Sequence, residues 1–238
     1  MTTQDNMVSH NQTSEHISFE ISIVFDNKCV NKGFRSGFGF SALVHNYFND
    51  NYVLFDTGGN SGVLLHNIRE LGVNPSQINK VVLSHNHYDH TGGFSGFYDQ
   101  NSEIELYVPN GIRRYEQKYP LADVYLHSQL KEIDDSVFIS GQLGTSIKEQ
   151  SVFCKTRDEK FVILVGCTHP GLENFIIKAR ELGNIEAVIG GFHGFRKYSY
   201  LKGIDFIGAC HCTQHVNAIK KKYSEHFQKV CVGDTFSF

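Results

Sequence analysis

The stretch "SHNHYDHTGG", residues 84–93, places three histidines and an aspartate within six positions. It directly follows the apolar run "VVL" at 81–83, which we expect to be a short buried strand. The histidines then lie on the loop at the C-terminal end of that strand, where functional residues are often found. We therefore interpret the stretch as a metal site rather than as a histidine-rich surface loop.

The spacing within the stretch predicts ligands for two ions. His85 and His87 are two residues apart, so on extended backbone their side chains point the same way and can bind one ion together. Asp89 and His90 are adjacent, and on a turning loop they can hold a second ion about 3.5–4 Å from the first. Imidazole and carboxylate ligands suit zinc, which we favour, and also iron or manganese.

The amino-acid composition indicates which kinds of molecule the protein is expected to bind. The chain of 238 residues has 22 basic and 25 acidic residues, so its net charge of −3 gives no reason to expect nucleic acid or an anionic membrane. We expect a small-molecule substrate, a cytoplasmic location and reduced cysteines, and we leave a homo-oligomer open. Residues 1–16 are polar and lack the apolar core of a secretory signal, and no run approaches the ~20 apolar residues of a membrane span.

Strand and helix patterns are intermixed along the chain, which predicts an α/β or α+β class with stacked layers. After a polar tail at 1–16, we expect one domain over residues 17–238, and we assign no element to 122–150. Expected strands lie at 17–25, 41–48, 52–59, 81–83, 105–109, 185–191, 205–210 and 229–233, with a hairpin at 151–166. Expected helices lie at 61–72, capped by Ser61, at 111–119, at 171–183 with Phe175, Ile176, Ala179 and Leu182 inward, and at 213–227.

Several motifs together resemble one known family. "SHNHYDHTGG" resembles the HxHxDH signature of the metallo-β-lactamase superfamily, and "VLFDTGG" at 53–59 is similar to the aspartate segment that precedes it there. Later motifs are similar to those of a branch of small metal-dependent hydrolases that includes the archaeal dihydropterin synthase of methanopterin biosynthesis. These later motifs are "VILVGCTHPG" (162–171), "GGFHGF" (190–195) and "ACHCTQ" (209–214).

The resemblance covers about residues 18–238 and implies an αββα sandwich, two β-sheets with helices outside and metals at one edge. It makes His169 the third histidine of the first ion, beside His85 and His87. It also makes His211 a ligand of the second ion, with Asp89 and His90. Asp56 is expected to orient a ligand or the loop through hydrogen bonds.

One departure from the family pattern concerns the bridging aspartate that many superfamily hydrolases carry after the third histidine. Between His169 and His211 the chain has only Asp205, which we expect within a strand. Cys167 occupies a similar strand-end position, and a thiolate binds zinc well, although a buried cysteine is commonly a small apolar residue. Asp234 in "VGDTF" comes after His211 and is out of order for the role.

Two further motifs bear on catalysis. His193 lies between glycines in "GGFHGF", where close backbone approach would let it act as a general acid or contact a substrate oxyanion or phosphate; a plain loop histidine is the alternative. We take Asp89 and His193 as the catalytic residues. Cys210 and Cys212 flank His211 and are interpreted as packing residues.

These residues favour a dinuclear metal-dependent hydrolase. Two divalent ions that share a water lower its pKa toward ~7, and the resulting hydroxide would attack an ester or phosphoester bond of a small intracellular metabolite. One alternative is a dihydropterin synthase-like transferase that displaces diphosphate from a dihydropterin diphosphate. Another is a non-catalytic metal-binding protein. An oxygen-reducing di-iron centre is disfavoured, because "NHY" at 86–88 lacks the acidic residue expected there.

Overall fold

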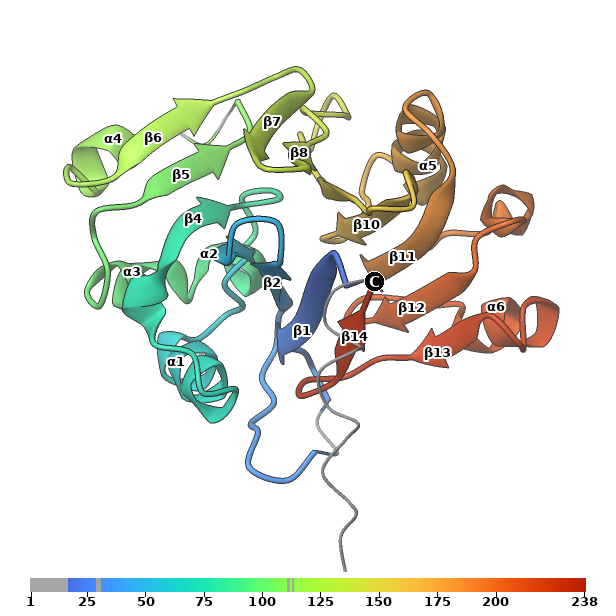
Figure 1. Ribbon diagram of the computed structural model, residues 1–238, viewed down its shortest axis with the longest axis horizontal. Helices are drawn as coiled ribbons and strands as arrows, with labels where there is room; N and C mark the ends of the chain where they lie inside the picture. The colour runs from blue at the N-terminus through green and yellow to red at the C-terminus, as the bar shows by residue number, and fades with distance from the viewer. Residues whose placement is uncertain (1–16, 29–30, 111, 113) are drawn as a thin grey trace, which may run out of the picture.

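The structure is a computed structural model that describes residues 17–28, 31–110, 112 and 114–238 (Figure 1). The expected polar tail at 1–16 lies outside the described residues. The first strands are β1 (Phe19–Phe25), β2 (Ser41–Asn46), β3 (Asn51–Phe55), β4 (Ile78–Val82), β5 (Glu105–Val108), β6 (Asp123–Leu126) and β7 (Lys131–Asp134). The later strands are β8 (Val137–Ile139), β9 (Val152–Lys155), β10 (Phe161–Val165), β11 (Ile185–Gly191), β12 (Phe206–Cys210), β13 (Phe227–Lys229) and β14 (Thr235–Ser237).

The helices are short and lie between strands. They are α1 (Ser61–Glu70), α2 (Tyr88–Thr91), α3 (Phe94–Tyr98), α4 (Tyr115–Lys118), α5 (Leu172–Arg180) and α6 (Val216–Lys222), with 3-10 turns at Pro75–Gln77 and Tyr198–Leu201. In the part of the chain that the structure describes, none of the helices has the length and apolar character needed to cross a bilayer.

The strands form two seven-stranded sheets, ordered β14-β1-β2-β3-β4-β5-β6 and β13-β12-β11-β10-β9-β8-β7. Strands β3 to β6 pair in parallel in the first sheet, and β10 to β13 pair in parallel in the second. Parallel neighbours end at the same edge of their sheet, and ligand sites favour the carboxyl ends of such strands. The predicted metal ligands follow β4, β10 and β12, so the topology brings them toward one edge of the sandwich.

Three apolar clusters define the layers. One cluster lies between the sheets and draws on both of them, for example Phe55 from β3 and Val162 from β10. A second packs α1 against the first sheet through Leu64, and a third packs α5 and α6 against the second sheet through Phe175 and Ile219. Figure 1 shows the helices on the two outer sides, so the predicted α/β class with a four-layer αββα sandwich is confirmed.

Some expected boundaries are wrong. The N-cap of α1 is Asn60, whose side chain accepts a hydrogen bond from the Val63 backbone, rather than Ser61. Helix α5 ends at Arg180, so Leu182 is 40% exposed instead of facing inward. Of the expected strand at 229–233 only Lys229 belongs to a strand, as the last residue of β13, and β14 begins at Thr235.

Two other segments differ in extent. The expected helix at 111–119 includes residues 111 and 113, which lie outside the described residues; of the described ones, only Tyr115–Lys118 form a helix, α4. The helix expected at 213–227 is shorter and forms only α6. The unassigned segment 122–150 contributes β6, β7 and β8, whose short strands lack a clear alternation of apolar residues.

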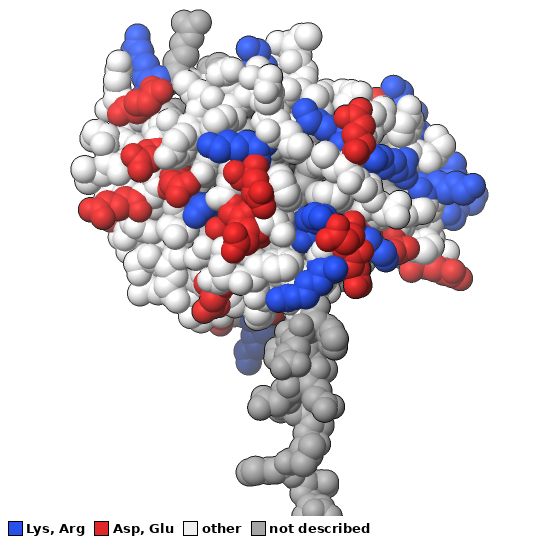
Figure 2. All heavy atoms as spheres, turned by 45° about the horizontal axis from the view of Figure 1, so that its top comes forward, with Lys and Arg blue, Asp and Glu red and all other residues white. Residues whose placement is uncertain are grey.

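Surface charge is mixed on the face that Figure 2 presents. Lysine and arginine side chains lie there among aspartate and glutamate side chains, without a broad field of one sign. This face is consistent with the near balance of 22 basic and 25 acidic residues in the sequence.

Candidate metal centre

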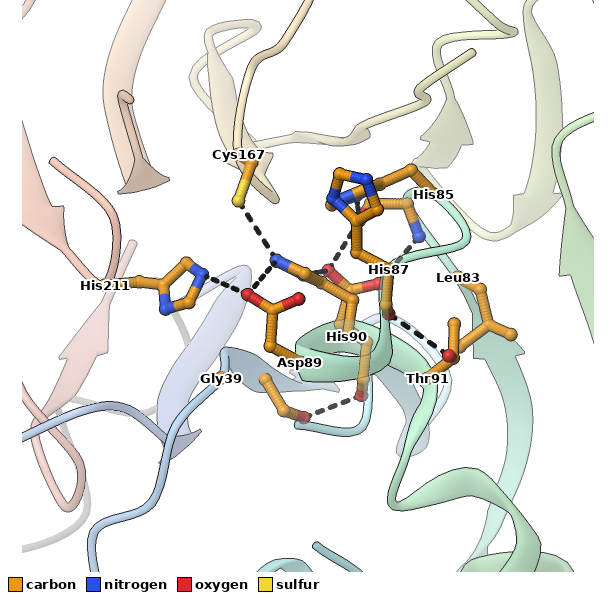
Figure 3. A network of polar contacts seen from close by, with 12 residues as sticks. Gly39, Leu83, His85, His87, Asp89, His90, Thr91, Cys167 and His211 are labelled. Atoms are coloured by element: carbon orange, nitrogen blue, oxygen red, sulfur yellow. Dashed lines mark hydrogen bonds and ion pairs between the residues drawn. The ribbon is translucent and has the colours of Figure 1, made fainter. Parts of the chain in front are cut away.

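Two groups of potential metal ligands meet where the two sheets open at one edge. Within each group, the ligand atoms all lie within 4.8 Å of one another. The first group is His85, His87 and His169, and the second is Asp89, His90, Cys167 and His211. The structure thus brings together all seven residues that the sequence nominated as metal ligands, from strand ends more than 120 positions apart. Figure 3 labels all of them except His169.

The backbone conformation after each strand sets the direction in which these side chains point. His85 and His87 follow β4, and the short helix α2 begins directly after His87, which turns Asp89 and His90 to the other group. His211 follows β12 with a φ of 48°, in the left-handed region. Its imidazole points toward Asp89 (Figure 3). Turns at the ends of strands from different sheets therefore build the site.

Asp56 supports one ligand of each group. Its buried carboxylate Oδ2 lies 2.6 Å from His90 Nδ1 and accepts a hydrogen bond from Ser84 Oγ at 2.7 Å. Because the Ser84 hydroxyl donates to Asp56, it accepts from His85 Nδ1, 2.9 Å away. Asp56 thus orients His90 directly and His85 through Ser84, which is the hydrogen-bonding role expected from the sequence.

Glu149 is a buried carboxylate that the sequence analysis missed. Oε1 accepts from the backbone nitrogens of Cys167 (2.8 Å) and Thr168 (2.7 Å), and Oε2 accepts from the backbone nitrogen of His169 (2.9 Å). Oε2 also lies 2.9 Å from His169 Nδ1. Burial alone would raise the pKa of Glu149, but these hydrogen bonds lower it to about 2, so the group is ionised at neutral pH.

Asp26 and Asn27 hold His211 and were also missed. Asp26 Oδ1 accepts from the His211 backbone nitrogen at 2.8 Å, and Asn27 Oδ1 lies 3.1 Å from His211 Nδ1. Asn27 Oδ1 also accepts from the Gly39 backbone, so it is the acceptor for the ring N–H. The sequence contains a pattern that could have indicated Asp26: "VFDN" at 24–27 repeats "LFDT" at 54–57, with an aspartate directly after an apolar strand.

The hydrogen bonds fix the tautomers in a way that suits metal binding. In His85, His90, His169 and His211 each Nδ1–H is used by an oxygen acceptor, so that Nε2 carries the lone pair. His85 Nε2 lies 3.0 Å from His87 Nδ1, and His90 Nε2 lies 3.1 Å from Cys167 Sγ. Burial, followed by the neighbouring His90, lowers the pKa of His85 to about 2, so this ring is neutral. Neutral imidazoles with free Nε2 atoms are the form that binds divalent metals.

His211 Nε2 supplies a direct test of fit. The atom is buried, and it has no hydrogen-bond partner of good geometry among the described residues, although Asp89 Oδ2 lies 3.2 Å away. Burial would raise the pKa of Asp89, but contacts with His211 and His90 lower it below its usual range. An ionised carboxylate, an orphaned imidazole nitrogen and a thiol in one group match the ligand set of a divalent metal such as zinc.

The cysteines of the site differ in environment. Cys167 Sγ lies 3.1 Å from His90 Nε2 and belongs to the second group. Cys212, interpreted as a packing residue, lies beside the centre: its thiol donates to the Cys167 carbonyl oxygen at 3.9 Å. The contact between the two cysteines raises the pKa of Cys167 and lowers that of Cys212. Cys210, by contrast, is buried in the core between the sheets, as expected.

The remaining candidates lie beside the site or away from it. His193 is exposed on the loop after β11, with its ring 5.2 Å from that of His169, and it lines a neighbouring cavity with Arg196. Asp205 precedes β12 instead of lying within a strand, and its carboxylate pairs with Lys160. Asp234 caps its own turn by accepting from the Cys231 backbone, outside both ligand groups.

Comparison with known proteins identifies the class. Residues 36–152 match the family model described as the Metallo-beta-lactamase superfamily. An uncharacterized protein of Methanocaldococcus jannaschii is 30% identical, over 81% of this chain and 90% of that protein. The chain therefore belongs to the metallo-β-lactamase superfamily.

Named relatives give further detail. The chain is 27% identical to the 7,8-dihydropterin-6-methyl-4-(beta-D-ribofuranosyl)-aminobenzene-5'-phosphate synthase of Methanocaldococcus jannaschii, over 87% of this chain and 92% of that enzyme. The crystal structure of YhfI from Bacillus subtilis has a TM-score of 0.68 at 13% identity and covers 92% of this chain and 99% of its own. Human tRNase Z, short form, has a TM-score of 0.64 at 14% identity, covering 92% and 98%. At such identities these two structures show a shared fold.

Proposed function

We propose that this protein is a dinuclear metal-dependent hydrolase that cleaves an ester or phosphoester bond of a small metabolite. The observation that carries the proposal is the pair of adjoining ligand groups, one of three histidines and one of Asp89, His90, Cys167 and His211. Membership of a superfamily that includes hydrolases supports it. Zinc fits the histidine and thiol ligands, and iron or manganese would fit the histidines and the carboxylate.

The chain's own residues prepare the centre. Asp56, Glu149 and Asn27 accept the Nδ1–H groups of His90, His169 and His211 and so orient these three imidazoles. When bound, two divalent ions would supply hydroxide at neutral pH and polarise the bond under attack. Asp89 stays ionised and holds its carboxylate toward His211, within the second group.

His193 is the candidate proton donor. Its exposed ring lies beside His169, on the rim of the centre, and its positive φ of 41° fixes the loop where the side chain emerges. A ring in this position would give a proton to a leaving group that departs from the first ligand group. We infer that His193 contributes to turnover without holding metal.

A hydrolysis screen tests the proposal. Metal-loaded wild type is assayed against ester, thioester, lactone and phosphodiester substrates, beside His85→Ala and Asp89→Ala. Removing a ligand should lower the rate at least about a hundredfold, or ~3 kcal/mol of transition-state stabilisation. His226→Ala, an exposed histidine at the far end of β12, serves as the matched control and should keep full activity. Equal rates for wild type and both ligand variants would overturn the proposal.

A transferase is the second candidate, because a named relative at 27% identity is a synthase of a dihydropterin product. In this reading the same centre would assist departure of diphosphate from a dihydropterin diphosphate. Diphosphate release is measured with and without an aminobenzene co-substrate. Release that requires the co-substrate favours the transferase, and release that water alone supports favours the hydrolase.

A further inference from the structure

A cavity of about 350 Å³ adjoins the first ligand group at His87. Its walls combine the apolar residues Pro109, Ile112 and Ile147 with the polar side chains of Asn86, Asn110 and Ser146. Lys148 also lines the cavity, and none of the described lining residues is a carboxylate. In a chain of net charge −3, the cavity beside the metal ligands therefore carries a positive charge.

The position of Lys148 is fixed by the two residues that follow it. Glu149 binds the strand end that carries Cys167 and His169, as described above. Gln150 donates from its backbone to Ser84 O and from its side chain to Leu83 O, both at 2.9 Å. The segment is thereby hydrogen-bonded to two of the strand ends that bear predicted metal ligands, those of β4 and β10, which places Lys148 beside the centre.

Lys148 has no ion-pair partner among the described residues, whereas the buried Lys80, for example, pairs with Glu105 and Asp134. We propose that Lys148 binds an acidic group of the substrate, a carboxylate or a phosphate, that is separate from the bond attacked at the metal centre. The proposal rests on the proposed function, because it places the reacting bond at that centre. It makes Lys148 a specificity-determining residue for anionic substrates.

The chemistry of the cavity supports this assignment. The ammonium would donate charge-assisted hydrogen bonds to the anion, and the Asn86 and Asn110 amides would satisfy its remaining lone pairs. The apolar residues Pro109, Ile112 and Ile147 would contact the uncharged part of the same substrate. Losing one such bond should weaken binding about tenfold.

Binding measurements on metal-loaded protein test the proposal without turnover. The probes are benzoate and phenylphosphonate, which carry the two candidate acidic groups, and the neutral benzamide. Lys148→Gln should weaken both anions about tenfold and leave benzamide unchanged, while Lys148→Arg should retain most of the affinity. Lys220→Gln, on the exposed face of α6, is the matched control and should behave as wild type. A loss confined to one anion would identify which acidic group the cavity selects.

The outcomes separate the two proposals. Equal affinity of wild type and Lys148→Gln for both anions, at equal metal content, would overturn the role of Lys148 and leave the hydrolase intact. The wild type could fail to hydrolyse any substrate while Lys148→Gln still lowers the affinity for the anions. That result would overturn the proposed hydrolase and keep the anion subsite.

Discussion

Glu149 accepts two hydrogen bonds from His169: its Oε2 lies 2.9 Å from the backbone nitrogen and 2.9 Å from Nδ1 of that residue. The other oxygen of Glu149 accepts from the Cys167 backbone, so a single buried carboxylate positions a ligand of each group. Asp56 does the same on the opposite sheet for His90 and, through Ser84, for His85. With Asp26, which accepts from the His211 backbone, three buried carboxylates support the centre.

Replacing Glu149 should damage stability and metal binding together. In Glu149→Gln the amide cannot accept from all four N–H groups, and we expect a loss of about 3 kcal/mol in unfolding free energy. Urea unfolding and metal analysis measure the two effects. Glu181→Gln, at the exposed end of α5, is the control and should change neither. Wild-type stability in Glu149→Gln would contradict the supporting role.

Asp56→Asn should weaken metal binding more than folding. The amide can still accept from Ser84, but it no longer provides the charged acceptor for His90 Nδ1. Loss of such a supporting partner typically lowers metal affinity 10–100-fold. Competition with a chromophoric chelator gives the affinity, with Asp205→Asn as an exposed control. Unchanged affinity in Asp56→Asn would show that His90 needs no such acceptor.

Cys167 should contribute a thiolate ligand to the second group. Cobalt-substituted wild type is then expected to show a thiolate-to-cobalt charge-transfer band that is lost in Cys167→Ser. His193→Ala and Cys154→Ser should keep the band, because His193 lies beside the site and Cys154 is buried in the core. A band that survives in Cys167→Ser would assign it to another thiol, with Cys212 as the nearest candidate.

We expect Glu149 to make the unfolding free energy depend on pH in the acidic range. Its pKa falls from 4.5 to about 2 on folding, so the folded state favours the ionised carboxylate. The resulting stability is complete above about pH 4.5 and is lost as the pH falls toward 2. Urea unfolding of metal-free protein should therefore show a shallower slope in this range for Glu149→Gln than for Glu181→Gln. Parallel slopes would show that Glu149 does not cause the pH dependence of the unfolding free energy.

The sequence allowed the members of the two candidate ligand groups to be picked out because most of them carry a local signal. His85, His87, Asp89 and His90 share one motif, and His169 and His211 each follow an apolar strand within a motif of the superfamily. Their supporting residues are harder to find. Glu149 binds a strand end 18 to 20 residues away, and no pattern around it indicates that contact, which depends on how β9 and β10 pair.

Among the strands, too, those with a clear sequence pattern were predicted and those without one were missed. Long apolar segments such as β1, β10 and β11 were predicted, because buried strands need continuous apolar runs. The short edge strands β6, β7 and β14 were missed, since half-exposed strands of three or four residues carry little periodicity. The apolar residues of 229–233 pack without forming a strand, although Val230 and Val232 are buried.

The central claim, two ions held by two ligand groups, is tested most directly by the metal content of protein purified without added metal. Wild type should contain about two ions per chain. His169→Ala and His211→Ala, which each remove one ligand from a different group, should each retain about one. Fewer than one ion per chain, bound equally by wild type and both variants, would contradict the dinuclear centre.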